Sequence, residues 1–438
     1  MKKVFEILSR LLKHELISGS FYLFVGGTVA NFLAFIYNLF LAKTLIPADY
    51  GVYGSLLSII TLIGVPVSSL GPVIVKFAAD YLAKNENEKA ERLYIRMSQF
   101  ILIISLILFA SFVIFSETIK AFLHIQNTIF VIFSGLIISF FYLNLVNSSF
   151  IQSILKFKQL SVINILGGMA KLAVGIPLIL LGFKIYGALG GVFAMAVTVF
   201  LSGFIPLRFL LKNIKQNTSA IPIKEIINYA LPTSFAVFFL TSFTSTDVIL
   251  VKHFFNAHDA GFYAGLSLVG KVIFYFTNPI PMVMFPLIIK RSSSGKNFSG
   301  LFYLALVLII LPSFAITAFY FMFPSFVIRL FLSGKDYLSI APFLGFFGIY
   351  LTVFSIVNLF ISFFLSLNKM KIVPAIVISA VSQAILISFY HKNFYEVIGV
   401  SLLVCSLLLV VLLLYYIFHF GSFRKVKGAP YIEAIPSV

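Results

Sequence analysis

The sequence predicts an all-α polytopic membrane protein whose twelve transmembrane helices form two six-helix bundles. Its 438 residues are 61% hydrophobic and 11% charged, and the mean hydropathy is +1.08. A soluble globular protein is about 45–50% apolar and about 25% charged. The chain also contains twelve apolar runs long enough to cross a bilayer, which takes about 20 helical residues. A short phrase that recurs in both halves indicates an internal repeat of six spans.

The N-terminal segment, residues 1–19, is predicted to form an amphipathic helix on the cytoplasmic membrane surface. Its apolar residues follow helical spacing and its lysines lie on the opposite face, as in helices of the membrane interface. Arg10 and Lys13 interrupt any apolar core, so the segment is not a secretory signal. A solvated start of the first span is the alternative.

The predicted spans divide into two bundles, 20–211 and 226–420, with a cytoplasmic linker at 212–225 and a cytoplasmic tail at 421–438. An even number of spans places both termini on one side of the membrane. The twelve spans are predicted at 20–42, 51–75, 98–116, 128–151, 160–182, 186–207, 226–251, 260–289, 300–322, 340–366, 372–390 and 396–419.

Basic residues indicate the orientation of these spans. Of the 32 Lys and Arg residues, 23 fall in segments on the side of the N-terminus and 7 in loops on the other side. Because cytoplasmic loops are enriched in Lys and Arg, both termini are predicted to lie in the cytoplasm, with the protein in the cell (plasma or inner) membrane. The formal charge of +18 is then mostly an orientation signal facing anionic lipids, with no nucleic acid as partner.

The repeated phrase reads DYGVYGSLL at 49–57 and DAGFYAGLS at 259–267, an offset of 210. Six spans separate the copies, so both halves enter the membrane in the same direction and a pseudo-two-fold axis along the membrane normal relates them. The aspartates of the phrase are expected to cap helix N-termini and its glycines to permit close packing. The recurring pairs are Asp49 and Asp259, Gly51 and Gly261, Tyr53 and Tyr263, and Leu56 and Leu266.

Prolines interrupt the two spans that this phrase opens. Pro66 and Pro72 lie in the second span, and Pro279 and Pro281 lie in the eighth. A proline removes a backbone hydrogen bond and kinks its helix, and interrupted helices at corresponding positions of two halves point to a transport pathway. These prolines are therefore candidate hinges. The alternative is that proline is simply commoner in membrane helices.

The phrase PADYGVYG, the charged loop AKNENEKAERLYIRM that follows, and the six-plus-six spans resemble the polysaccharide-biosynthesis flippases. These lipid-linked oligosaccharide (O-antigen type) translocases belong to the multidrug/oligosaccharidyl-lipid/polysaccharide exporter superfamily. The resemblance implies two bundles around a cavity lined mainly by spans one, two, seven and eight. It implies a flippase that moves a polyprenyl-(pyro)phosphate-linked oligosaccharide from the cytoplasmic to the outer leaflet by alternating access.

The partners implied are the polyprenyl-linked glycan lipid, membrane lipids, a polysaccharide polymerase and glycosyltransferases, and we expect the protein to be a monomer. No enzyme activity, cofactor or metal is expected. The histidines show no paired metal spacing, and the single cysteine forms no disulfide framework. The stretch GLSLVGKV at 265–272 nearly matches a phosphate-binding loop, but Val272 replaces the Ser or Thr that would bind magnesium.

Two ionisable residues of the second half are candidate substrate-binding residues. Lys271 lies about 16 Å into the eighth span at 1.5 Å per residue, where a compact cation could meet a pyrophosphate. The alternative is a salt bridge with Asp247 of the seventh span, which is also a candidate for ion coupling. Both interpretations hold if the substrate displaces the pair.

The first half contributes four further candidates. Asn31 and Asn38 share one face of the first span with small residues, and this face either lines a cavity or packs closely against another helix. Lys171 lies near mid-depth in the fifth span, which is peripheral in the resembling fold. Lys76, at the inner end of the second span, either meets the phosphate or is an interfacial lysine.

The alternative function is a multidrug-and-toxin-extrusion-type cation antiporter. Such a protein exports cations against the membrane potential and couples to an inward ion, usually through buried acids. An anionic pyrophosphate instead gains about 2.3 kcal/mol per charge per 100 mV on moving outward. Because Asp247 is the one acid expected deep within a span, the sequence favours export of a lipid-linked anion.

Overall fold

The computed structural model is all-helical and describes residues 15–68, 70–84, 86–211, 234–293, 297–332, 336–367 and 369–420. Within these residues, eleven helices are long and apolar enough to cross a membrane. A pair of helices bent by 45°, at 234–242 and 246–254, makes a twelfth span when it is counted as one. The predicted all-helical, multi-pass fold is therefore confirmed. The predicted tail and most of the predicted surface helix lie outside the described residues.

The chain separates into two compact units. The first unit comprises residues 1–241 together with 251–265, and the second comprises 242–250 together with 266–438. The predicted linker at 212–225 lies outside the described residues, so the limits of the two bundles stay a prediction.

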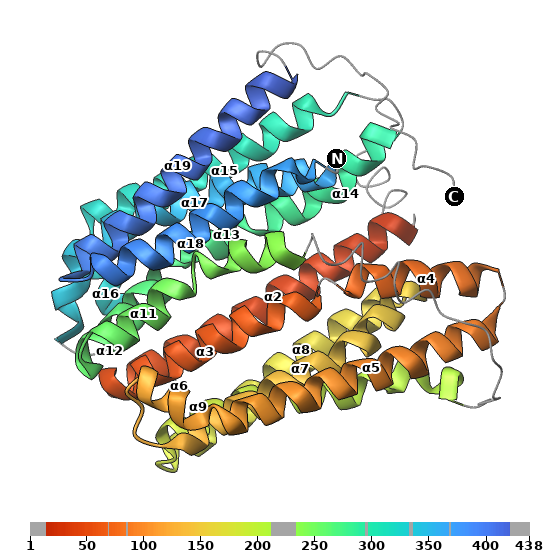
Figure 1. Cartoon of the computed structure of the whole chain (residues 1–438), viewed down its shortest axis with the longest axis horizontal. Helices are drawn as coiled ribbons and strands as arrows, with labels where there is room; N and C mark the ends of the chain where they lie inside the picture. Colours follow the sequence, from red (N-terminus) through yellow and green to blue (C-terminus); the bar gives the residue numbers. More distant parts are fainter. Residues whose placement is uncertain are drawn as a thin grey trace, which may run out of the picture. The chain divides into compact units, whose positions relative to one another are not determined.

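The first unit is built around one central helix, α7, which packs against α3, α4, α5 and α9 (Figure 1). Helix α2 lies against α8, and α8 packs along α9. The bounds are α2 (Glu15–Thr44), α3 (Pro47–Ser68), α4 (Gly71–Ala83), α5 (Asn87–Ile114), α6 (Ser116–Phe122), α7 (Thr128–Ser153), α8 (Phe157–Leu180), α9 (Lys184–Gly203) and the 3-10 helix η1 (Ile205–Leu211).

The second half of the chain repeats this plan around α17, which packs against α13, α14, α15 and α19. Ala341, the first residue of α17, corresponds to Val131 of α7 at the offset of 210. The bounds are α11 (Thr246–Phe254), α12 (Ala257–Gly270), α13 (Val272–Thr277), α14 (Pro279–Ser293), α15 (Ser299–Met322), α16 (Pro324–Phe331), η2 (Asp336–Ile340), α17 (Ala341–Ser366), η3 (Met370–Ile372), α18 (Val373–Phe389) and α19 (Phe394–Phe420).

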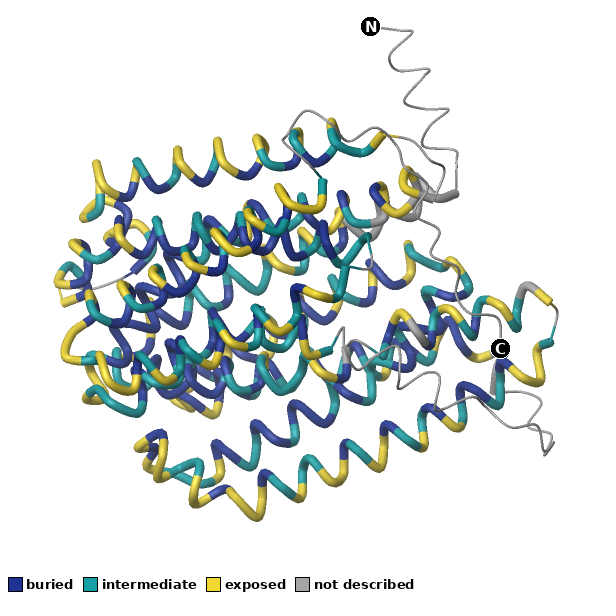
Figure 2. The backbone as a smooth tube through the Cα atoms, turned by 45° about the horizontal axis from the view of Figure 1, so that its top comes forward, coloured by how far each residue is buried: buried dark blue, intermediate teal, exposed yellow. Residues whose placement is uncertain are grey.

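Large apolar side chains are exposed along many helices, where exposed and buried residues alternate turn by turn (Figure 2). Ile107 of α5, Phe314 of α15 and Phe418 of α19 have 62%, 70% and 81% of their surface exposed. Soluble monomers rarely expose contiguous apolar surface on this scale. These exposed apolar faces suit contact with the hydrocarbon of a membrane. In that solvent apolar residues are found both on the surface and in the interior of the protein.

The two spans with candidate hinges are each divided into shorter helices, and the role of the prolines as hinges stays a prediction. Helix α3 ends at Ser68 before α4 begins, and the chain between α13 and α14 breaks at Asn278. These two positions differ by the repeat offset of 210, so the breaks are equivalent in the two halves. A second break in the eighth span, at Lys271, has no counterpart in α3.

Three of the four candidate hinge prolines begin helices. Pro72 lies in the first turn of α4, Pro279 is the first residue of α14, and Pro281 is in its first turn. A proline is tolerated there because the missing N–H has no partner within the helix. Pro66 differs, since it lies inside α3 and removes a hydrogen bond two residues before that helix ends.

The two copies of the repeated phrase contact each other within the first unit. A Cβ atom added at Gly51 of α3 would lie 2.8 Å from the backbone nitrogen of Gly261 on α12, and one added at Gly261 would overlap the carbonyl of Pro47. One turn further, a Cβ at Gly54 would lie 3.0 Å from the Cβ of Ala264. The glycines of the phrase therefore permit close packing, as the sequence predicted.

Asn256, rather than Asp259, caps helix α12. The side-chain oxygen of Asn256 accepts a hydrogen bond from the backbone N–H of Asp259 at 2.8 Å, and its amide donates to the Asp259 carboxylate at 2.7 Å. Asp259 and Asp49 lie in the first turns of α12 and α3, where a negative charge favours the positive end of the helix dipole.

Candidate functional site

The predicted polar face of α2 makes few close contacts. Asn31 is exposed, and a Cβ added at Gly27, on the same face, would meet no atom within 4 Å. Gly26 is instead the close-packed position, since a Cβ there would clash with Ser161 of α8. Asn38 accepts a hydrogen bond from the hydroxyl of Tyr53 on α3 at 2.9 Å. Close helix packing therefore uses the neighbouring face of α2, and the cavity-lining role of Asn31 and Asn38 stays a prediction.

Tyr37 anchors α2 to α8 and α9. Its ring fits where glycines leave room, because a Cβ at Gly175 or Gly191 would overlap it. The side chain is completely buried, and its hydroxyl donates to the carbonyl of Ala188 at 2.8 Å. The ammonium Nζ of Lys171 on α8 lies 4.7 Å from the ring centroid, within the range of a cation–π interaction.

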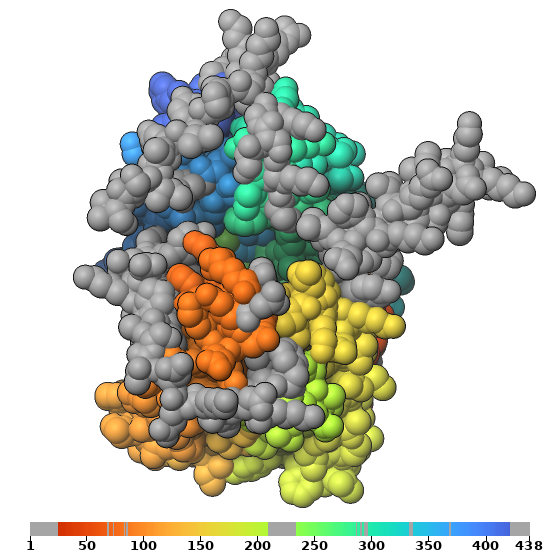
Figure 3. Space-filling view, turned by 90° about the vertical axis from the view of Figure 1, so that its right-hand side faces the viewer, coloured from red at the N-terminus to blue at the C-terminus, as the bar shows by residue number. Residues whose placement is uncertain are grey.

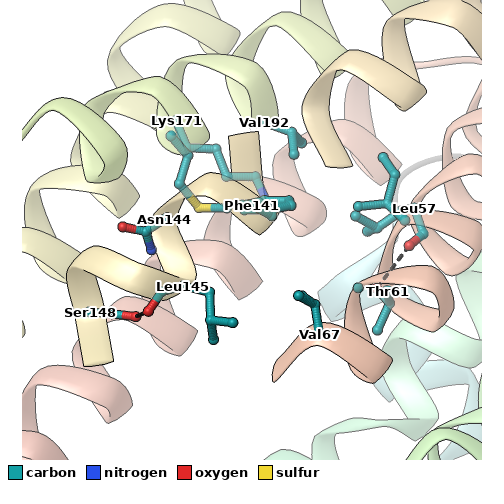
Figure 4. A pocket seen from close by; sticks show the side chains of 12 residues that line it. Leu57, Thr61, Val67, Phe141, Asn144, Leu145, Ser148, Lys171 and Val192 are labelled. Carbon is teal, nitrogen blue, oxygen red and sulfur yellow. Dashed lines mark hydrogen bonds between the residues drawn. The ribbon is translucent and has the colours of Figure 1, made fainter. Parts of the chain in front are cut away.

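Lys171 also lines a cavity of about 390 Å³ inside the first unit (Figure 4). Lys171, Asn144 and Ser148 lie on one side of it, and Leu57, Thr61 and Val67 of α3 face them across the space. Besides these, the cavity is lined by Ile60, Gly64, Phe141, Leu145, Val192 and Met195. The structure therefore brings together residues of α3, α7, α8 and α9 around a single buried lysine.

The second unit contains a buried polar cluster beside the bend before α11. Residues 243–245 interrupt the helix, and the carbonyl of Phe243 accepts hydrogen bonds from the Tyr350 hydroxyl and, at 3.1 Å, from the Gln383 amide. Gln383 also donates to the Ser401 hydroxyl at 2.9 Å, and within the described part of the chain its own side-chain oxygen has no hydrogen-bond partner. Spans seven, ten, eleven and twelve thus meet through polar side chains.

Asp247 belongs to this cluster. It is completely buried in the first turn of α11, and its Oδ1 accepts a hydrogen bond from the backbone N–H of Val248 at 2.8 Å. It lies near enough to Tyr350 and Cys405 for its charge to act on both. A carboxylate beside amide, hydroxyl and carbonyl oxygens offers the ligand type that hard cations prefer, and it offers a position for a proton.

Lys271 is half-buried at the break between α12 and α13. The charge of Asp247 acts on its ammonium, but the two form no direct ion pair in the structure, nor does Lys271 form one with any other described side chain. Asp247 therefore acts on Lys271 through its charge, without the salt bridge that was one of the two alternatives. Lys76 is exposed on α4, beyond the break in the second span.

Sequence reasoning missed Tyr37, Asn144, Tyr350, Gln383 and Ser401. The sequence does single out Gln383, because a side-chain amide is unusual in the apolar run that forms α18. The glycines of α8 and α9 also indicated a large side chain inserted between helices. Neither signal identifies the partner, which depends on how each helix is rotated.

Comparison with known proteins assigns the family. The family described as "Polysaccharide biosynthesis protein" matches residues 40–342. Comparison with curated proteins gave no match.

Solved structures agree on the fold. An inward-facing multidrug resistance MATE family transporter of the MOP superfamily has a TM-score of 0.68 and 14% identity, covering 91% of this chain and 96% of its own. The lipid II flippase MurJ in an inward closed conformation has a TM-score of 0.67 and 17% identity, covering 90% of this chain and 86% of its own. The chain belongs to the polysaccharide biosynthesis protein family, and its fold is similar to that of the MATE transporter and of MurJ.

Proposed function

We propose that the protein is a flippase that moves a polyprenyl-(pyro)phosphate-linked oligosaccharide from the cytoplasmic to the outer leaflet for assembly of a cell-surface polysaccharide. Transport proceeds by alternating access. The family supports a role in polysaccharide biosynthesis, and the fold is one that MurJ, a lipid II flippase, also has. An O-antigen-type glycan is the substrate class we propose.

The charge inside the described spans is the observation that supports an anionic substrate. Lys171 is buried with no carboxylate partner among the residues that the structure describes, and Lys271 is half-buried. Lys252, predicted in a loop, is also buried at the end of α11, with 2% of its surface exposed. Asp247 is the only completely buried carboxylate among the described residues. Spans with more cationic than anionic groups suit a phosphate rather than an organic cation.

The proposed orientation places both termini in the cytoplasm. Residues of α4 and of the turn between α7 and α8 are exposed side by side on one face of the first unit (Figure 3). Lys76 of α4 and Lys158 in the first turn of α8 are exposed. Basic residues gathered at one end of the spans suit anionic lipids of the cytoplasmic leaflet.

Transport in vesicles of purified protein tests this proposal. A polyprenyl-pyrophosphate-linked glycan is incorporated on both leaflets, and a membrane-impermeant glycosidase then measures how much becomes accessible from outside. We expect nearly complete digestion with the protein and about half without it. Uptake of a fluorescent organic cation by the same vesicles, with no movement of the glycan lipid, would establish the antiporter alternative instead.

A further inference from the structure

Lys171 is a buried cation for which the described part of the chain provides no counter-ion. Only 3% of its surface is exposed, and the ring of Tyr37 is the one partner of its ammonium among the described residues. Lys271, by contrast, has the charge of Asp247 nearby. Burial of an uncompensated ammonium is costly, and such a group within a span marks a functional site.

A second polar side chain on the same side of the cavity also lacks a hydrogen-bond partner among the described residues. The amide of Asn144 makes no hydrogen bond with other described residues, although it lines the cavity beside Lys171 (Figure 4). The hydroxyls of Thr61 and Ser148 donate to carbonyls of their own helices at 2.8 and 3.0 Å. Lys171 and Asn144 therefore provide N–H donors that make no hydrogen bond with other described residues, and such donors are the groups that bind an oxyanion.

The remaining walls determine what else the ligand carries. Aliphatic and aromatic side chains of α3, α7 and α9 line most of the cavity. Its volume of about 390 Å³ lies within the range of about 300–1,000 Å³ that small-molecule sites occupy. An inorganic anion would leave these apolar walls without contacts, so a ligand that fills the cavity needs a hydrocarbon part next to its negative charge.

We propose that this cavity binds the phosphate end of an amphiphilic lipid, with Lys171 as its counter-ion, Asn144 as a second donor and the hydrocarbon against the apolar walls. Polyprenyl pyrophosphate and anionic phospholipids share this chemistry. Identification of the ligand as the transported lipid rests on the proposed function, whereas the need for an anion beside Lys171 does not.

Direct binding to the purified full-length protein tests the site. The probes are radiolabelled polyprenyl pyrophosphate, with phosphatidylglycerol and inorganic pyrophosphate as competitors. Lys171→Met removes the charge, and Gly64→Leu fills the cavity at a position where an added Cβ meets no atom within 4 Å. Matched controls are Lys84→Met, at an exposed lysine, and Gly399→Leu, at another glycine with open space.

We expect both Lys171→Met and Gly64→Leu to weaken binding by about tenfold or more, while both controls bind as the unchanged protein does. Competition by phosphatidylglycerol identifies a membrane phospholipid as the ligand, and its failure to compete identifies the polyprenyl lipid. Either result supports the phosphate-lipid site. Full competition by inorganic pyrophosphate at equal concentration would contradict the hydrocarbon part of the proposal.

Unchanged binding in Gly64→Leu overturns the site even where Lys171→Met fails to fold. Transport distinguishes this inference from the proposed function. If both cavity variants flip the glycan lipid and bind the probe normally, the proposed flippase function is supported and the proposed lipid site is contradicted. If probe binding depends on Lys171 but the unchanged protein flips no glycan lipid, the lipid site is supported and the proposed flippase function is contradicted.

Discussion

Gly51 of α3 and Gly261 of α12 meet backbone to backbone, since a Cβ at Gly51 would lie 2.8 Å from the Gly261 nitrogen. The two residues hold the same place in the two copies of the repeated phrase, 210 positions apart. The repetition therefore has a physical reason. Each copy provides the small surface that the other needs in order to pack closely.

Gly51→Val and Gly261→Val should each force α3 and α12 apart. Overpacking of a close contact typically costs about 1–3 kcal/mol, so the buried Ala264 should become accessible. The measurement is the rate of maleimide labelling of Ala264→Cys, after the single native cysteine, Cys405, has been replaced by alanine. We expect labelling several times faster in either valine variant.

Gly27→Val is the matched control for this experiment, because a Cβ at Gly27 meets no atom within 4 Å. Labelling of Ala264→Cys should stay slow in that variant. Equal labelling rates in all the variants would show that the glycines of the phrase are not needed for the contact.

Lys271→Ala should reduce export of lipid-linked glycan by about tenfold or more while the protein still inserts. Lys271 is half-buried at a helix break, so truncation removes a cation from the span without leaving a large cavity. The measurement is polymer at the cell surface per unit of protein in the membrane, with Lys84→Ala as an exposed-lysine control. Normal polymer at a normal protein level would exclude a role for Lys271.

Composition and charge predicted much of the fold, because crossing a bilayer constrains helix length and loop charge directly. The helix breaks near Ser68 and Asn278 were less predictable. Proline positions indicated the interrupted spans, but the structure places Pro72 and Pro279 at helix starts. A proline in an apolar run is compatible with a kink or with a new first turn, and only the surrounding packing decides between them.

The candidate site was harder to predict than the fold. The 3.6-residue period shows which residues share a face of α2, but in an apolar solvent hydrophobicity does not reveal which face packs inward. Tyr37 and Asn38 are adjacent in sequence, yet one inserts among the glycines of α8 and α9 and the other bonds to α3. Lys171 was identified by its charge, while its cavity depends on residues of four helices.

Asp247→Asn should abolish any dependence of transport on an ion gradient. Asparagine retains the oxygen that accepts from the Val248 N–H, so the fold of α11 is maintained while the charge is lost. The measurement is the flipping rate in vesicles as the proton, sodium and electrical gradients are collapsed one at a time. Identical rates for the unchanged protein after each collapse would count against coupling through Asp247.

Tyr37→Phe and Tyr37→Ala should separate the hydroxyl of Tyr37 from its ring. The phenylalanine variant loses the hydrogen bond to the Ala188 carbonyl, worth about 0.5–1.5 kcal/mol, but it keeps a ring beside Lys171. The alanine variant also leaves a cavity among the glycines, and such truncations cost about 3–5 kcal/mol. Thermal unfolding in detergent should therefore rank the unchanged protein first, Tyr37→Phe second and Tyr37→Ala last. Gly399→Ala should unfold like the unchanged protein, since its added methyl meets open space. A Tyr37→Phe variant as unstable as Tyr37→Ala would mean that the hydroxyl, rather than the packed ring, holds α2 against α8 and α9.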